Sequence, residues 1–100
     1  MTNVGVIGGG LIGASWAAIF SKSGFNVYVY DSHPTVFETY IKRVKLFLEE
    51  LKSIDKDINI EESLDRISTN VSIEELCSKA DYIQESAPEI LSVKQELFAR

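Results

Sequence analysis

A glycine-rich stretch between two apolar runs constrains the fold of this chain more than any other feature. Residues 4–7 are apolar and lead directly into a G-x-G-x-x-G pattern at residues 8–13. Small residues follow, and a second apolar run at 27–30 ends at Asp31, which lies 18 residues after Gly13. This order predicts a strand, a tight turn, a helix, and a second parallel strand with a carboxylate at its end.

Such a βαβ unit is typical of a site that binds a dinucleotide. Gly8 allows the sharp turn out of the first strand, and Gly10 leaves room for a pyrophosphate to approach the backbone N–H groups at the positive end of the helix. Gly13 allows the helix to pack closely on the sheet. Asp31 can accept hydrogen bonds from ribose hydroxyls and would repel a 2′-phosphate, so the pattern favours NAD over NADP.

Two other interpretations of this stretch remain open. It could be a glycine-rich turn that only connects two elements, or the FAD-binding version of the same unit. The residues between the three glycines belong to the same turn and are also candidate cofactor contacts: Gly9, Leu11 and Ile12.

Composition excludes several classes of function. The net charge of −5 argues against electrostatic binding of nucleic acid, and no apolar run reaches the ~18 residues of a membrane span. No secretory signal is evident at the N-terminus. The single cysteine, Cys77, cannot form an intrachain disulfide and fits a reducing compartment, so we expect a cytoplasmic protein. No spacing of His, Cys or Asp suggests a metal site.

The rest of the chain continues the alternation of helices and strands. The further predicted elements are helices at 11–23, 34–52 and 61–65, a strand at 66–69, a helix from the Ser72 cap to 79, a strand at 80–85, a loop at 86–89, and a helix from 90 or 91. This pattern predicts an α/β fold with a Rossmann-type doubly wound parallel sheet of about four strands, incomplete, with a helical insert after the second strand.

Individual side chains in these elements carry further predictions. In the helix at 34–52, the predicted apolar stripe consists of Phe37, Ile41, Val44, Leu48 and Leu51, widened by Tyr40 and Phe47. Cys77 is expected to be a small buried residue of its helix. The only histidine, His33, lies in the loop after Asp31 and is expected either to face solvent or to lie on the adenine side of the site.

A second candidate segment follows the predicted strand at 80–85. The carboxyl ends of parallel strands share one edge, so the loop at 86–89 should border the same crevice as Asp31. Glu89 and Lys94 could reach the cofactor from there, although their spacing also fits the charged first turn of a surface helix.

Residues 8–31, 80–89 and 94–98 together resemble the amino-terminal domain of the 3-hydroxyacyl-CoA dehydrogenase family. Within it, residues 13–16 and 83–89 are most similar to the carnitine dehydrogenase and lambda-crystallin branches. The resemblance implies that NAD is contacted by the glycine turn, Asp31, Glu89 and Lys94. It places the catalytic residues of the family beyond residue 100, so we expect residues 1–100 to be the amino-terminal portion of the NAD-binding domain. The carboxyl-terminal substrate and dimerisation domain is expected to be absent.

The resemblance also implies an activity. The whole enzyme would oxidise carnitine, another 3-hydroxy acid or a 3-hydroxyacyl-CoA by hydride transfer to NAD, and it would form a homodimer. Acyl-CoA enzymes of the family carry polar and basic CoA contacts on the helix after the second strand. Phe47 and Leu51 are among the apolar positions of this helix here, which favours a free hydroxy acid. A non-catalytic, crystallin-like protein and a truncated inactive fragment are the alternatives.

Overall fold

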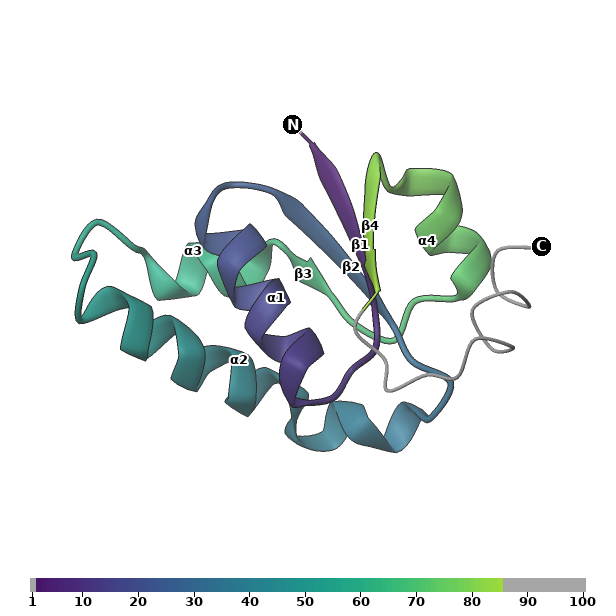
Figure 1. Ribbon diagram of the computed structural model, residues 1–100, viewed down its shortest axis with the longest axis horizontal. Helices are drawn as coiled ribbons and strands as arrows, with labels where there is room; N and C mark the ends of the chain where they lie inside the picture. The colour runs from purple at the N-terminus through teal and green to yellow at the C-terminus, as the bar shows by residue number, and fades with distance from the viewer. Residues whose placement is uncertain (1, 86–100) are drawn as a thin grey trace.

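A computed structural model describes residues 2–85, which form a four-stranded parallel sheet with helices on both faces (Figure 1). The strands are β1 (Asn3–Ile7), β2 (Asn26–Tyr30), β3 (Ile67–Ser68) and β4 (Tyr82–Glu85). Their order in the sheet is β3-β2-β1-β4. The chain therefore moves outward from β1 to β3 and then returns to the other side of β1. This reversal creates a switch point between β1 and β4, where open α/β sheets bind their ligands.

The helices divide between the two faces of the sheet. They are α1 (Leu11–Lys22), the 3₁₀ turn η1 (Pro34–Val36), α2 (Phe37–Lys52), α3 (Ile60–Asp65) and α4 (Ile73–Lys79). The first helices of the chain, α1 to α3, pack with one another, whereas α4 contacts β1 and β2. The predicted doubly wound arrangement with a helical insert after the second strand is confirmed.

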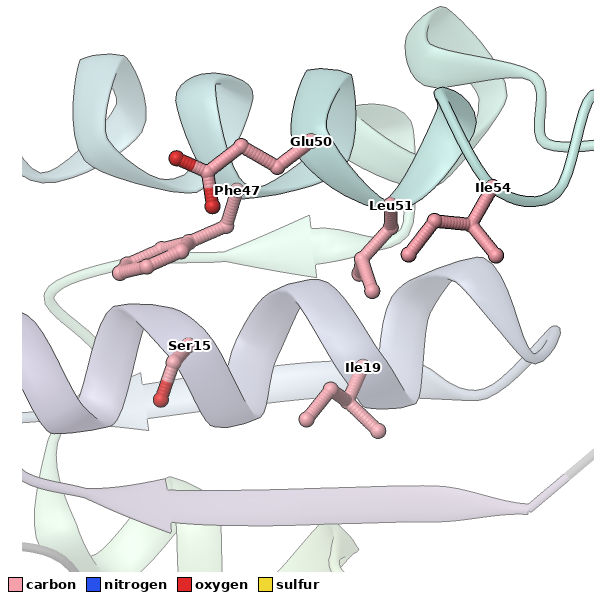
Figure 2. Close-up of a pocket in the computed structure, with 6 residues that line it drawn as sticks. All are labelled: Ser15, Ile19, Phe47, Glu50, Leu51 and Ile54. Carbon is pink, nitrogen blue, oxygen red and sulfur yellow. The ribbon is translucent and has the colours of Figure 1, made fainter.

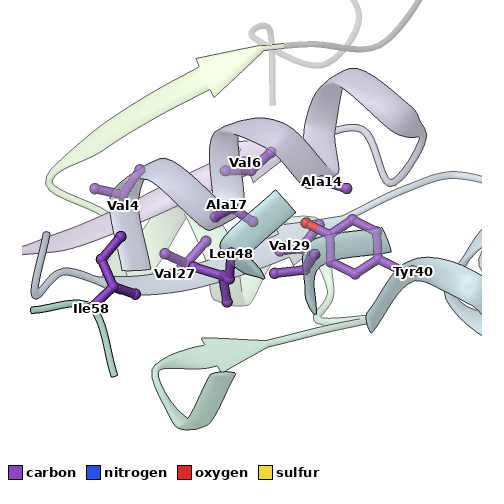
Figure 3. Packing of buried hydrophobic residues seen from close by; sticks show 11 residues of the cluster. Val4, Val6, Ala14, Ala17, Val27, Val29, Tyr40, Leu48 and Ile58 are labelled. Carbon is purple, nitrogen blue, oxygen red and sulfur yellow. The ribbon is translucent and has the colours of Figure 1, made fainter. Parts of the chain in front are cut away.

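The larger core lies between the sheet and the helices α1 and α2 (Figure 3). Side chains alternate between the faces of a strand, so Val27 and Val29 of β2 point into this core together. Ala14 and Ala17 of α1 are fully buried against the sheet, and their small size allows the helix to approach it closely.

The smaller core lies on the opposite face, beneath α4. Ile7, Ile73 and Leu76 are buried there. A Cβ atom at Gly5 would lie 2.5 Å from Cδ2 of Leu76, so α4 packs directly on the backbone of β1.

Several local predictions are confirmed. The chain leaves α1 at Gly24 with a φ of +97°, a left-handed conformation that favours glycine. The hydroxyl of Ser72 caps α4 by accepting a hydrogen bond from the N–H of Glu75 at 3.0 Å.

Other local predictions were wrong. Residues 34–36 form a 3₁₀ turn, so the α-helix of the insert begins only at Phe37. Ile41 is 40% exposed, because the buried stripe of α2 runs through Tyr40, Val44 and Leu48 instead. Cys77 is exposed, since α4 turns Ile73 and Leu76 toward the sheet.

The predicted strands at 66–69 and 80–85 are shorter than expected, and the latter begins at Tyr82. The predicted loop at 86–89 and the helix after it lie outside the described residues. Among residues 2–85, no helix has the length and apolar character needed to span a bilayer.

Candidate dinucleotide-binding site

The glycine turn leaves β1 at the carboxyl edge of the sheet. Gly8 has a φ of +119°, a conformation that is strained for residues with a side chain. Its N–H donates a hydrogen bond of 2.7 Å to the carbonyl of Tyr30, the last residue of β2. This bond joins the ends of the two strands, so the turn and Asp31 lie next to each other.

Asp31 points toward the glycine turn. Its Oδ2 accepts a hydrogen bond from the N–H of Gly9 at 2.7 Å, and its Oδ1 accepts one from the N–H of His33 at the same distance. The side chain is only 14% exposed. A carboxylate has about four acceptor positions, so both oxygens can still accept bonds from a ligand hydroxyl.

His33 lies in the loop beyond this carboxylate. Its Nδ1 is 3.7 Å from Oδ1 of Asp31, and its side chain is 82% exposed. The side chain therefore faces solvent, which is one of the two predicted positions.

Gly10 is the N-cap of α1. Its φ of −82° is accessible to any residue, and a Cβ built on it meets no heavy atom of the described residues within 4 Å. The fold around it therefore does not require a glycine. The first turn of α1 also contains no acidic residue. The amides at this positive helix end thus face a space that a phosphate could enter.

The rest of the glycine turn continues into the first turn of α1. Gly13 is buried, as predicted for a point of close packing. Leu11 and Ile12 are 60% and 62% exposed, so both apolar side chains lie at the surface beside Gly10. The turn, these two residues and Asp31 share one edge of the sheet. Glu89 and Lys94 lie outside the described residues.

A separate pocket of about 200 Å³ lies between α1 and α2 (Figure 2). It is lined by Ser15, Ile19, Phe47, Glu50, Leu51 and Ile54. These residues follow the first turns of the two helices and include none of the predicted cofactor contacts.

The sequence analysis did not identify the side chains of the helical insert that contact the glycine turn. A Cβ atom at Gly9 would lie 2.6 Å from Cγ2 of Val36, and the hydroxyl of Tyr40 donates to the carbonyl of Gly13 at 3.4 Å. The periodicity placed Tyr40 on the apolar face of its helix but did not identify the residue that this face contacts. No local pattern signals the position of Val36.

The parallel sheet, the glycine turn and the strand-end carboxylate define a Rossmann-type dinucleotide-binding domain. Residues 3–100 match the family described as 3-hydroxyacyl-CoA dehydrogenase, NAD binding domain. The chain belongs to this family, whose cofactor is NAD, and the predicted resemblance is confirmed.

Named relatives agree with this assignment. The human lambda-crystallin homolog is 38% identical over 99 residues, covering 95% of this chain and 31% of the relative. L-Carnitine dehydrogenase of Streptomyces griseus is 32% identical, covering 97% of this chain and 28% of that protein. The chain thus spans about a third of the length of these relatives.

Solved structures share the fold. The 3-hydroxybutyryl-CoA dehydrogenase of Escherichia coli superposes with a TM-score of 0.81 at 30% identity, covering 98% of this chain and 21% of that one. FadB2 of M. tuberculosis also has a TM-score of 0.81, at 26% identity, covering 96% of this chain and 34% of that one.

Proposed function

We propose that this chain is the NAD-binding portion of a dehydrogenase that oxidises the hydroxyl group of a 3-hydroxy acid or a 3-hydroxyacyl-CoA. Bound NAD supplies the hydride acceptor for this chemistry. The residues of this chain bind and orient the cofactor, and the proton-abstracting residues are expected beyond residue 100.

The observation that carries the proposal is the open space at Gly10. Neither the backbone angle nor a neighbour among residues 2–85 accounts for glycine at this position. A pyrophosphate drawn close to the amides does account for it, because a side chain would occupy that space. In this proposal the amides at the start of α1 hold the pyrophosphate, since those of Gly8 and Gly9 already donate hydrogen bonds within the protein. The exposed side chains of Leu11 and Ile12 pack against the cofactor.

Asp31 completes the site by binding the adenosine ribose. Backbone N–H groups already hold its carboxylate beside the turn, so a ribose can bind without reorienting it. The same negative charge would repel a 2′-phosphate, which favours NAD over NADP. Glu89 and Lys94 are proposed as further contacts on the basis of the family resemblance alone.

For the substrate, we favour a free 3-hydroxy acid such as carnitine. Relatives that are more than 30% identical include L-carnitine dehydrogenases. In addition, Phe47 and Leu51 of α2 line an apolar pocket rather than forming a basic surface suited to CoA phosphates. A homodimer is proposed for the whole protein, as the family resemblance implies.

A structural role is the second candidate, because several relatives are named lambda-crystallin or its homolog. Both roles are tested with the full-length product of the gene. Calorimetric titration with NAD, NADP and FAD should show that NAD binds most tightly. NADH absorbance should then rise with L-carnitine or a short 3-hydroxy acid and stay lower with a 3-hydroxyacyl-CoA. NAD binding without turnover of any of these substrates would favour the structural role, and preferred binding of FAD would overturn the proposed cofactor site.

A further inference from the structure

The start of the helical insert packs against the glycine turn at Gly9. Gly9 does not have a positive φ, so its backbone could accommodate a side chain. A Cβ atom there would nevertheless lie 2.6 Å from Cγ2 of Val36 and 3.2 Å from the ring of Phe37. These two side chains therefore fill the space beside Gly9, and their packing excludes a side chain at this position.

A second contact from the same segment reaches the turn at Gly13. Tyr40 is fully buried, and its hydroxyl donates a hydrogen bond of 3.4 Å to the carbonyl of Gly13. Figure 3 shows the ring of Tyr40 beside Ala14 of α1. The ring of Phe37 meets that of Tyr40 edge-on, with 5.4 Å between centroids and an interplanar angle of 72°. Burial raises the pKa of the Tyr40 hydroxyl, which keeps it protonated and able to donate.

We propose that Val36, Phe37 and Tyr40 are positioning residues that hold the glycine turn in the geometry that binds NAD. Their contacts at Gly9 and Gly13 lie on either side of Gly10, where the pyrophosphate is proposed to enter. The inference rests on the proposed cofactor site. Beyond that site, we propose that the helical insert influences the affinity for NAD by fixing the conformation of the glycine turn.

The physical basis is preorganisation. A pyrophosphate is bound by several backbone amides, and each must point at the ligand to contribute. A turn that is already held in this orientation loses less conformational freedom on binding than a mobile one. Weakening the contacts behind the turn should therefore lower affinity for NAD.

A rescue experiment tests the contact at Gly9, using the full-length product of the gene and calorimetric titration with NAD. Gly9→Ala forces a methyl group against Val36 and should weaken binding about tenfold. Val36→Ala alone should weaken it less. The double variant should bind NAD more tightly than Gly9→Ala, because the new methyl group occupies the space that Cγ2 has left. If the fold-losses in NAD affinity of the two single variants simply multiply in the double variant, the proposal is wrong.

A second pair of variants tests the contact at Gly13. Tyr40→Phe removes only the hydroxyl and should weaken NAD binding about threefold, with faster hydrogen exchange at the amides of residues 9–13. Val44→Ala is the matched control: Val44 is fully buried one helical turn further along α2. It should lower thermal stability while leaving NAD affinity and exchange in the turn unchanged. Equal effects of the two variants on affinity would show that α2 contributes only general stability.

Comparison with Gly10→Glu distinguishes a failure of the positioning role from a failure of the proposed cofactor site. If Gly10→Glu weakens NAD binding but the variants at Val36 and Tyr40 do not, the site stands and the positioning role is wrong. If Gly10→Glu also leaves NAD affinity unchanged, the proposed cofactor site is wrong.

Discussion

The backbone N–H of Gly9 donates a hydrogen bond of 2.7 Å to Oδ2 of Asp31, although 22 residues separate them along the chain. This bond couples the two parts of the candidate site: the turn that we propose to bind the pyrophosphate and the carboxylate that we propose to bind the ribose. Gly9 therefore contributes through its backbone amide. The same bond holds the Asp31 carboxylate beside the glycine turn in the absence of a cofactor.

Asp31→Asn should weaken NAD binding about tenfold, because a neutral amide makes weaker hydrogen bonds to N–H and hydroxyl groups than a carboxylate. Removing the negative charge should also narrow the preference for NAD over NADP. Calorimetric titration with both cofactors measures these two effects.

Asp81→Asn is the matched control. Asp81 also accepts a backbone hydrogen bond, from the N–H of Asn3 at 2.9 Å, but it lies at the opposite edge of the sheet. It should leave both affinities unchanged. A cofactor preference that does not change in Asp31→Asn would contradict the proposed ribose contact.

Gly10→Glu should weaken NAD binding more than tenfold while changing the free energy of unfolding by about 1 kcal/mol or less. The new side chain would extend into space that the described residues leave open, and its charge would repel the pyrophosphate. Titration with NAD and urea unfolding measure affinity and stability separately.

Gly5→Ala, in contrast to Gly10→Glu, should lower stability and leave NAD affinity unchanged. A Cβ atom at this position would lie 2.5 Å from the buried side chain of Leu76, so overpacking should cost about 1–3 kcal/mol of stability. Affinity of the folded protein for NAD should stay close to the wild-type value. If Gly10→Glu instead destabilised the fold as much as Gly5→Ala, glycine at position 10 would have a structural explanation.

Tyr40 should make the fold sensitive to alkali. Burial raises the pKa of its hydroxyl above the ordinary value of about 10, so the folded state retains a proton that the unfolded state releases. This contribution to stability is fully present below pH 10 and is lost as the pH rises further, by up to about 1.4 kcal/mol per pH unit.

Urea unfolding between pH 8 and 11 tests the alkaline effect. Tyr40→Phe should flatten the decline in stability, whereas Tyr82→Phe, at a side chain that is 51% exposed, should leave it unchanged. Identical slopes for wild type and Tyr40→Phe would show that Tyr40 is not responsible.

Cys77 should react with a thiol reagent such as dithionitrobenzoate in the native protein, since its side chain is exposed on α4. Cys77→Ser should abolish labelling at this residue and change the free energy of unfolding by no more than about 0.5 kcal/mol. Labelling of Cys77 that required denaturant would contradict the observed exposure.

Much of the architecture could be predicted because it depends on local chemistry. Glycine is needed at Gly8 and Gly24 because both have positive φ, and Ser72 caps a helix whose first turn follows it in the chain. The spacing from Gly13 to Asp31 reflects the length of one helix and one strand. These features arise from neighbouring residues, so a single sequence is enough to reveal them.

Predictions failed where a residue's environment depends on the elements that pack against it. Ile41 and Tyr40 are adjacent and both fit the apolar stripe of α2, yet Tyr40 is fully buried and Ile41 is exposed. The orientation of α2 against α1 determines which of them enters the core. Cys77 is exposed for the same kind of reason, since the orientation of α4 directs Leu76 inward.

By itself, the sequence determined the βαβ unit and the class of ligand, because periodicity, glycine placement and strand-end charge act over short distances. The residues that it predicts to contact the ligand remain a prediction. Only the tertiary structure determined that Gly9 donates to Asp31 and that Val36 and Tyr40 support the turn. Those contacts join segments that are distant in the chain. They form only when the parallel strands align and α2 packs beside α1.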